Sequence, residues 1–357
     1  MSVLRDAIKV VDDLRFDGEE WAMRAMLTAL ITQYDEQWGH QNSSWDVKAC
    51  EVTLSAPMYN LNSGRVRRSH VIAGKIDKIV NMHPGAGGYE RHAIFDHKTT
   101  SSDIAPESNY WRQLNVDTQP KHYMLLARTK GYPVSKVFWD VVRKPSLKPK
   151  ALTKANWREA VEEGTYLGEK ISEDSRQECL GALKQENEEL FGIRILVNLR
   201  GNPDRYFQRR SVTPLMTELA EHTENMIDVS YDMAEARKRY RNTGRVVKNS
   251  GSCMNYNTPC KFLGVCSGHA DLTDHGWKNR EHVFPELPEI EGQYGNKTVI
   301  THSRVRCFQT CPAKHQYQYE DGYYRAQEVT SQALYFGTVW HDVMDAWWTA
   351  EKGGADE

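Results

Sequence analysis

The ten residues AIFDHKTTSS (93–102) contain a short apolar run that ends abruptly in an acid, a histidine and a lysine. The run predicts a buried strand, and side chains two residues apart on a strand point to the same side of the sheet. Asp96 and Lys98 should therefore face one common space. Taken alone, the pair fits a surface ion pair as well as a metal ligand beside a catalytic ammonium group.

A second acid lies on the strand-like segment that precedes this run. The segments SHVIAGKIDKIVNM (69–82) and ERHAIFDHKTT (90–100) are separated by HPGAGG (83–88), which predicts a hairpin loop. Pairing of the two strands would bring Asp77 beside Asp96. Two converging carboxylates repel each other unless a cation lies between them, and Mg²⁺ and Mn²⁺ prefer such oxygen ligands. A lysine beside that cation could orient or deprotonate a water, or neutralise charge on a phosphate.

Length and composition limit the classes of protein that remain. The chain has 357 residues, 39% of them hydrophobic, which is enough for one large domain or two ordinary ones. A net charge of −2 excludes a uniformly basic nucleic-acid binder but leaves room for a local basic groove. No apolar run approaches the roughly 20 residues that span a bilayer, and no GxxxxGK[ST] phosphate loop occurs. We expect a soluble, intracellular protein with no membrane partner and no motor activity.

The remaining sequence predicts helices around a small sheet. Met23, Leu27, Leu30, Ile31 and Tyr34 recur at helical spacing within the first 45 residues. Strands are expected at 48–58 and 134–145, and helix at 109–131 with a break or a new first turn at its internal proline. Residues 150–248 are charged and predict a helical insert, whereas 275–298 are polar, with proline and glycine, and predict a linker.

Four motifs together resemble the PD-(D/E)xK nucleases, in particular their RecB-like branch. The motifs are GKID (74–77), IFDHKTT (94–100), the Q-x-x-x-Y pattern in DTQPKHYMLLA (117–127) and the G-x-x-x-H pattern in FGTVWHDVMDAWW (336–348). Each motif alone is unspecific, since His341 on a tryptophan-rich helix is more often a core histidine, and Gln119 and Tyr123 are more often a surface pair. Their co-occurrence carries the resemblance.

The resemblance implies a role for each matching residue. Asp77 and Asp96 bind the metal together with the backbone carbonyl of His97, and His341 helps to hold it. Lys98 assists catalysis. Gln119 and Tyr123 position the substrate strand, and the least specific assignment is Glu51, an acid on the preceding strand.

Three of the seven cysteines predict a second metal site. Cys253, Cys260 and Cys266 are spaced C-x6-C-x5-C in SCMNYNTPCKFLGVCSG (252–268), which favours a site for a soft metal over a disulfide framework. The resemblance to nucleases of the AddB and CRISPR-associated exonuclease groups, which carry an iron–sulfur staple, implies a fourth ligand. That ligand is Cys311 in SRVRCFQTCPAKHQYQY (303–319), with Cys307 as a competitor. A 4Fe–4S cluster is the first expectation, zinc the alternative, and unliganded core cysteines the third reading.

The order of the motifs differs from that of the family. The S-R-x-x-x-F-x-x-C-P and G-x-x-x-H motifs, which precede the acidic motifs in the family, stand here at 303–312 and 337–341. This order indicates a circular permutation. We expect a nuclease core at 1–274 with the insert at 150–248 and the cysteine loop at 253–266, a linker at 275–298, and a segment at 299–357 that docks on the core, either in the same chain or by a domain swap between copies.

Together these features predict an α/β protein with a restriction-endonuclease-like core. The expected activity is metal-dependent hydrolysis of DNA, as an exonuclease on single-stranded or duplex ends, in recombination, repair or phage replication. We expect a bacterial or phage-encoded protein in the host cytoplasm, with recombination or replication proteins or a swapped copy of itself as partners. The alternative is a non-catalytic DNA-binding scaffold that retains the fold and the cluster, which the intact Asp77, Asp96 and Lys98 disfavour.

Overall fold

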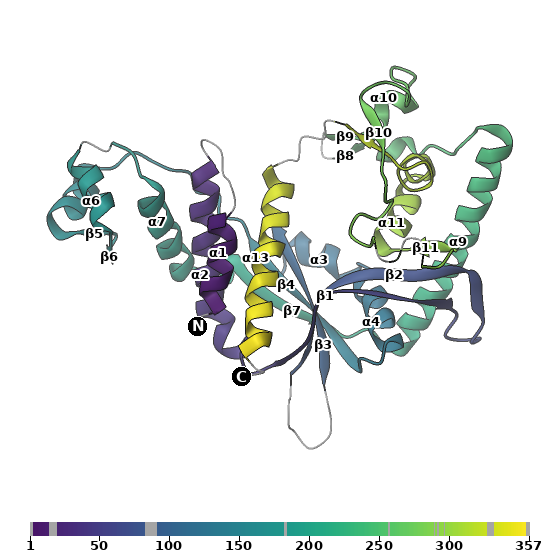
Figure 1. Cartoon of the computed structure of the whole chain (residues 1–357), viewed down its shortest axis with the longest axis horizontal. Helices are drawn as coiled ribbons and strands as arrows, with labels where there is room; N and C mark the ends of the chain where they lie inside the picture. Colours follow the sequence, from purple (N-terminus) through teal and green to yellow (C-terminus); the bar gives the residue numbers. More distant parts are fainter. Residues whose placement is uncertain are drawn as a thin grey trace.

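A mixed six-stranded sheet forms the centre of the molecule (Figure 1). The structure, a computed structural model, describes residues 3–13, 20–82, 91–181, 184–255, 258–288, 290, 293–295, 297–326 and 332–354. The strand order is β1-β2-β3-β4-β7, and β11 pairs with β2. The strands are β1 (Asp46–Tyr59), β2 (Val66–Asn81), β3 (His92–Thr100), β4 (Val134–Arg143), β7 (Phe207–Val212) and β11 (Thr298–Ile300). The predicted α/β class, a small mixed sheet flanked by helices, is confirmed.

The strands that carry the acidic motifs lie in the middle of this sheet. β2 and β3 are antiparallel, with Lys78 opposite Phe95 and Val80 opposite Ala93, whereas β3 and β4 are parallel. The apolar run of β3 is fully buried because both faces of the sheet are covered. The predicted loop HPGAGG lies outside the described residues.

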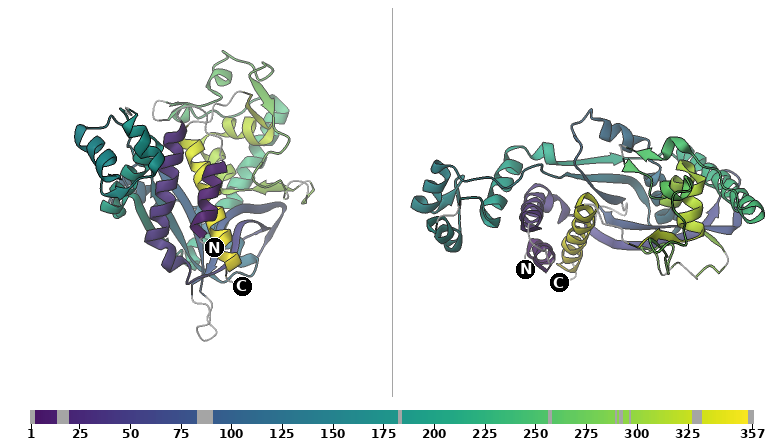
Figure 2. Two further views of the ribbon diagram at one scale, coloured as in Figure 1. Left: turned by 60° about the vertical axis from the view of Figure 1, so that its left-hand side comes forward. Right: turned by 90° about the horizontal axis from the view of Figure 1, so that it is seen from above.

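Helices cover both faces of the sheet (Figure 2). One face packs against helices from the two ends of the sequence, α1 (Val3–Asp13), α2 (Trp21–Asn42) and α13 (Gln332–Gly354). The other face packs against α4 (Gln119–Thr129) and α9 (Met216–Thr243). The alternation of a strand explains this arrangement, because Phe95 belongs to the first apolar core and its neighbour Ile94 to the second.

The predicted helical spacing in the first 45 residues is confirmed by α2. All five predicted apolar positions are buried in the core that α2 shares with α1 and α13: Met23, Leu27, Leu30, Ile31 and Tyr34. The expected break in 109–131 is also confirmed. Helix α3 (Asn109–Asn115) ends before it, and α4 begins with Pro120 in its first turn, where a missing N–H leaves no bond unmade.

The segment predicted as a helical insert has a more varied structure. It contains α5 (Lys154–Arg158), η2 (Glu159–Glu163), β5 (Thr165–Tyr166), β6 (Glu169–Lys170), α6 (Glu173–Leu180), α7 (Glu188–Gly201) and α8 (Pro203–Tyr206). It also contributes β7, which joins the main sheet antiparallel to β4. The sequence of β7, FQRRSV, carries few apolar residues because an edge strand buries little of its length.

The C-terminal part of the chain returns to the sheet. β11 pairs in parallel with His70–Ile72 of β2, and α13 packs on α1, β1 and β3. The stretch predicted as a linker is packed as well, since Phe284, Leu287 and Ile290 form an apolar cluster with Val71 of β2.

The other short elements are η3 (Ser250–Ser252), β8 (Met254–Asn255), β9 (Thr258–Pro259), α10 (Leu263–Cys266), β10 (Trp277–Asn279), α11 (His302–Thr310), α12 (Pro312–His315), η4 (Gln316–Glu320) and β12 (Tyr323–Arg325). Within the described part of the chain, every helix is too short or too polar to cross a membrane.

Candidate active site

The site lies at a fork between β2 and β3. Their paired register ends at Lys78 and Phe95, and its continuation places Asp77 opposite Asp96. At this point the carboxylate of Asp77 accepts a hydrogen bond of 2.8 Å from the backbone N–H of His97. A side chain thus satisfies a backbone N–H of β3 at the point where the ladder between the two strands ends.

Lys98 links the acid of β3 to helix α4. Its Nζ lies 2.5 Å from Oδ2 of Asp96 and donates to Oε1 of Gln119 at 3.1 Å. The amide nitrogen of Gln119 in turn donates to the hydroxyl of Tyr123 at 2.9 Å. Asp96 is almost fully buried, so this ion pair is held in one geometry by its surroundings. The structure therefore brings together the acid, the amine and both residues of the Q-x-x-x-Y motif.

A second group of ligands converges on Asp77 from the other side of the fork. One ligand atom from each of Glu51, Asp77 and His341 lies within 4.8 Å of the other two, and Nδ1 of His341 is 3.6 Å from Oδ2 of Asp77. Glu51, on β1, has a left-handed backbone with φ 46°, which a non-glycine residue adopts at a cost of about 1–2 kcal/mol. Such strain is concentrated at functional sites, and here it occurs where Glu51 faces Asp77.

Two glycines allow helices to approach this fork closely. A Cβ at Gly337 of α13 would lie 3.2 Å from Oγ1 of Thr99 on β3. A Cβ at Gly74 of β2 would lie 3.1 Å from the ring of Tyr123 on α4. These contacts explain why the GKID and G-x-x-x-H motifs begin with glycine, since a larger residue would displace Tyr123 or His341 from the site.

Two of the three acids at the fork, Asp96 and Glu51, have raised pKa values because nearby positive charge does not offset their burial. Burial, together with the charge of Asp77, raises the pKa of Asp96 to about 7 even though Lys98 opposes the shift. Burial also raises the pKa of Glu51, which the ion pair with Lys75 offsets only in part. Burial alone would raise the pKa of Asp77, but the surrounding histidines and lysines outweigh it and lower that pKa. A further cation at this position would stabilise the ionised form of all three acids.

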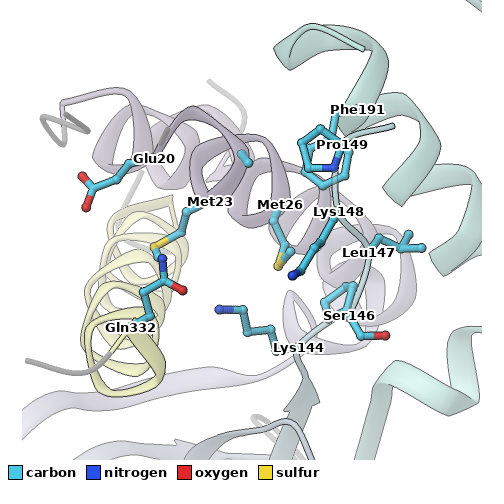
Figure 3. A pocket seen from close by; sticks show the side chains of 12 residues that line it. Glu20, Met23, Met26, Lys144, Ser146, Leu147, Lys148, Pro149, Phe191 and Gln332 are labelled. Carbon is cyan, nitrogen blue, oxygen red and sulfur yellow. The ribbon is translucent and has the colours of Figure 1, made fainter. Parts of the chain in front are cut away.

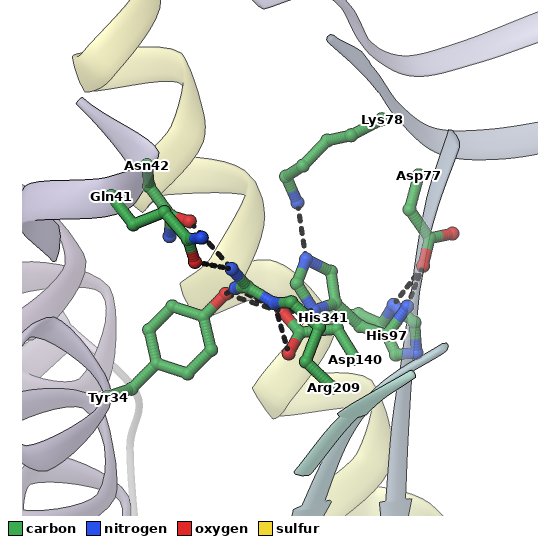
Figure 4. A network of polar contacts seen from close by, with 9 residues as sticks. All are labelled: Tyr34, Gln41, Asn42, Asp77, Lys78, His97, Asp140, Arg209 and His341. Atoms are coloured by element: carbon green, nitrogen blue, oxygen red, sulfur yellow. Dashed lines mark hydrogen bonds and ion pairs between the residues drawn. The ribbon is translucent and has the colours of Figure 1, made fainter. Parts of the chain in front are cut away.

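A buried polar network holds β3 on the opposite side (Figure 4). Nδ1 of His97 lies 3.2 Å from Oδ2 of Asp140 on β4, and Nε2 lies 2.9 Å from Nζ of Lys78. Asp140 also accepts from the hydroxyl of Tyr34 at 2.5 Å and pairs with Arg209 of β7 at 3.2 Å. Burial lowers the pKa of His97 to about 4, so the ring is neutral, donating to Asp140 and accepting from Lys78. The network ties α2, β2, β4 and β7 to the strand that carries Asp96.

Comparison with known proteins agrees with this geometry. The sequence model of the PD-(D/E)XK nuclease superfamily matches residues 3–191 and 299–357, which is more than half of the chain. The chain belongs to the PD-(D/E)XK nuclease superfamily. A search of curated proteins finds no significant match. A solved structure described as "Crystal structure of SSO0001" is 11% identical over 50% of this chain and 81% of that chain, with a TM-score of 0.17, and does not bear on the fold.

The donor set of this PD-(D/E)XK chain fits a hard divalent cation. Two carboxylates and an imidazole converge on one point at the fork, and the nearby Asp96 adds a third carboxylate. Oxygen-rich sets of this kind suit Mg²⁺ and Mn²⁺. Glu51, the least specific assignment from the sequence, lies in the closely spaced group with Asp77 and His341. The carboxylate of Asp96 instead pairs with Lys98.

Several residues of this site were not predicted from the sequence. Lys75 pairs with Glu51 at 2.7 Å, and Asp117 caps the first turn of α4 while it pairs with His302 at 3.1 Å. The side chains of His97 and Lys78 are fully buried, although only the backbone of His97 was expected to matter. A signal for Lys75 was present, because it precedes Asp77 by two residues on the same strand and therefore lies on the same side.

The four predicted cysteine ligands line a separate cavity of about 210 Å³. Cys253, Cys260 and Cys266 surround it together with Cys311 of the C-terminal segment. Its wall also contains Phe262 and Leu263, as well as the two cationic residues Lys248 and Lys314. Cys307, the competitor for the fourth position, is buried beside this group but does not line the cavity.

Proposed function

We propose that this chain is a metal-dependent deoxyribonuclease that degrades DNA as an exonuclease from single-stranded or free duplex ends. The observation that carries the proposal is the joint position of Asp77, Asp96, Lys98 and His341 at one fork of the sheet. A phosphodiester needs charge neutralisation and an activated water, and these groups supply both. From the resemblance to the RecB-like branch, we propose that it acts in recombination, repair or phage replication in a bacterial cytoplasm.

The residues have distinct tasks in this mechanism. Glu51, Asp77 and His341 would hold Mg²⁺ or Mn²⁺, and by the family resemblance Asp96 and the backbone carbonyl of His97 would be further ligands. When bound, the cation supplies a Lewis acid for phosphate oxygens and lowers the pKa of a coordinated water. The ammonium of Lys98, held between Asp96 and Gln119, would neutralise negative charge that develops on the phosphate.

Gln119 and Tyr123 act on the position of the substrate. Their side chains form a chain of hydrogen bonds from Lys98 to the surface of α4, beside a cavity that Lys75 and His302 also line. A substrate strand that enters here meets donors from both helix and sheet. Tyr123 is half-buried, and burial raises its pKa, so it remains a neutral hydrogen-bonding group.

Metal dependence tests the proposed function directly. The purified chain is incubated with end-labelled linear single-stranded DNA in Mn²⁺, in Mg²⁺ or in EDTA. We expect labelled mononucleotides or short oligonucleotides to be released from the end with either metal and no release in EDTA. A covalently closed single-stranded circle serves as the control substrate. Absence of cleavage in every metal would contradict the nuclease, and cleavage of the circle would contradict the exonuclease.

We further propose a 4Fe–4S cluster in the cysteine-lined cavity. Four thiolates are the ligand set of such a cluster, and the four cysteines line one cavity of about 210 Å³ together with Phe262 and Leu263. Lys248 and Lys314 on the wall offset the negative charge of a cluster bound by thiolates. Because Cys311 is separated in sequence from the other three, the cluster would fasten the C-terminal segment to the cysteine loop.

The two candidate cysteines of this segment give opposite predictions. Cys311→Ser should abolish the broad absorbance at about 400 nm that an iron–sulfur cluster gives. Cys307→Ser should retain it, because Cys307 does not line the cavity. Anaerobic purification followed by absorbance and metal analysis checks both variants. Stoichiometric zinc without this absorbance in the wild type would contradict the cluster and favour the alternative.

We propose that the unusual order of motifs arose by circular permutation, with residues 299–357 docked within the same chain. Three observations support it: β11 extends the sheet beside β2, His341 reaches Asp77, and Cys311 reaches the cysteine loop. Helices α1 and α13, from opposite ends of the sequence, also pack side by side. A domain swap between two copies would form the same contacts, and recombination or replication proteins are the further partners that we propose.

A further inference from the structure

Two adjoining cavities lie beyond the metal site, where β3 and β4 end. The larger, of about 530 Å³, is lined by the start of α2, the start of α13, Phe191 of α7 and the segment 144–149 that leaves β4. The smaller, of about 190 Å³, lies on the other side of Lys144, between Ser101 and Arg205. Lys144 lines both cavities, so together they form one path along the end of the sheet.

The path is basic. Figure 3 shows the ammonium groups of Lys144 and Lys148 pointing into the larger cavity, while the carboxylate of Glu20 on its rim points away from them. Within the described ranges, neither lysine has a carboxylate at ion-pair distance. Arg143 and Arg205 add two positive charges in the smaller cavity, of which Arg143 pairs with Asp103.

Lys144 is held in place although it has no acidic partner. Its Nζ lies 4.8 Å from the ring centre of Phe336 on α13, and its backbone N–H donates to Thr100 of β3 at 2.7 Å. Burial lowers the pKa of this lysine because no carboxylate compensates for the lost water. A partly buried ammonium without a counter-ion is unfavourable on its own and is stabilised by an incoming anion.

The remaining lining of the larger cavity is apolar. Met23, Met26, Leu147 and Phe191 face the same space as the two lysines. Its volume is in the range of pockets that take small molecules, which admits a nucleotide or two and excludes a duplex. Apolar and aromatic side chains contact the faces of bases only where those bases are unpaired.

The path lies within reach of the metal site along the two elements that carry both. Gln332 lines the larger cavity and His341 reaches Asp77, and these two positions lie about 14 Å apart along α13. Ser101 in the smaller cavity comes directly after β3, about 10 Å along the extended chain from Lys98. A few nucleotides of an extended strand span either distance.

We propose that these cavities bind the backbone of an unpaired DNA strand that continues past the cleaved phosphodiester, with Lys144 and Lys148 contacting its phosphates and the apolar lining contacting its bases. The inference rests on the proposed nuclease function and adds the substrate path on one side of its site. It also gives a physical reason for action at frayed or single-stranded ends, since a paired strand does not fit the cavity.

Salt-dependent binding tests this inference separately from cleavage. Asp96→Asn in the full chain serves as the background, so that labelled single-stranded DNA is bound in Mn²⁺ without being degraded. Each phosphate contact on a single strand contributes about 0.7 to the slope of log K against log salt. Adding Lys144→Met and Lys148→Met, which keep the apolar stems, should lower the slope by about 1.4 and weaken binding about 10-fold or more at 0.1 M salt.

Matched variants and probes sharpen the result. Lys144→Arg with Lys148→Arg should keep the slope, and so should Lys170→Met, which removes an exposed lysine from the β5–β6 hairpin. An unchanged salt slope in the Lys144→Met, Lys148→Met variant would overturn the inference. An equal loss of affinity for a blunt duplex would also overturn it. So would a loss of affinity that is seen only with RNA or only with a mononucleotide as the probe. Cleavage by the wild type together with an unchanged slope would refute the path alone, whereas a lack of cleavage refutes the nuclease.

Discussion

Replacing Asp96 by asparagine should lower the rate of Mn²⁺-dependent DNA cleavage by about 10³-fold or more. Asparagine keeps the size of the side chain but removes the charge that faces both Asp77 and Lys98. Lys98→Met should cause a loss of similar size, because it removes the ammonium while retaining the stem. Single-turnover cleavage of end-labelled single-stranded DNA measures both effects.

The control for this result is an acid outside the site. Asp174, an exposed residue in the first turn of α6, is replaced in the same way, and Asp174→Asn should cleave at the wild-type rate. Thermal unfolding of each variant separates loss of catalysis from loss of fold. If folded Asp96→Asn and Lys98→Met cleave as fast as Asp174→Asn, the fork is not the active site.

Removing Asp140 should have the largest effect on stability. Asp140→Ala leaves Arg209 buried without its carboxylate and removes the acceptors of Tyr34 and His97. Loss of one partner from a buried ion pair lowers the free energy of unfolding by about 3–5 kcal/mol. Urea denaturation measures this change. Asp103→Ala is the matched control, since Asp103 is 61% exposed and its pair with Arg143 contributes at most about 1 kcal/mol. Equal effects of the two substitutions would contradict a structural role for the network.

The same network predicts how stability depends on pH. Burial alone would raise the pKa of Asp140, but the charge of Arg209 and the hydrogen bonds from His97 and Arg209 hold it well below its usual range. The native state therefore binds this proton less readily than the unfolded state. The contribution of Asp140 is fully present above the unfolded pKa of about 3.9 and is lost as the pH falls below it. In Asp140→Asn this part of the acid-induced decrease should be absent.

The sequence was informative where function depends on local pattern. Hairpin pairing of two adjacent strands was enough to place Asp77 opposite Asp96, because the register of neighbouring strands follows from their alternation. The start of α4 was also predictable, because proline is favoured in the first turn of a helix, where its missing N–H leaves no hydrogen bond unmade. His341 was predicted only from the resemblance to a family. It is far from Asp77 in sequence, and the spacing of residues within a helix or strand does not predict contacts between such distant positions.

Other features depended on contacts between distant segments. β11 has three residues and β7 mostly polar ones, so neither carries a strand signal of its own, and both exist because a buried strand offers them hydrogen bonds. The left-handed backbone of Glu51 is imposed by its surroundings rather than by its residue type. The partners of Asp140 come from α2, β3 and β7, and such a network is visible only after the chain has folded.

The joining of Asp77 and His341 at one fork has a consequence for biosynthesis. The ribosome makes the three acids and Lys98 long before it makes α13, so a growing chain carries an incomplete set of the proposed metal ligands. Contacts between residues so far apart in sequence also form late, because a long loop must close before they gain stability. If His341 is required as proposed, nuclease activity would arise after α13 has been made and has docked at the fork.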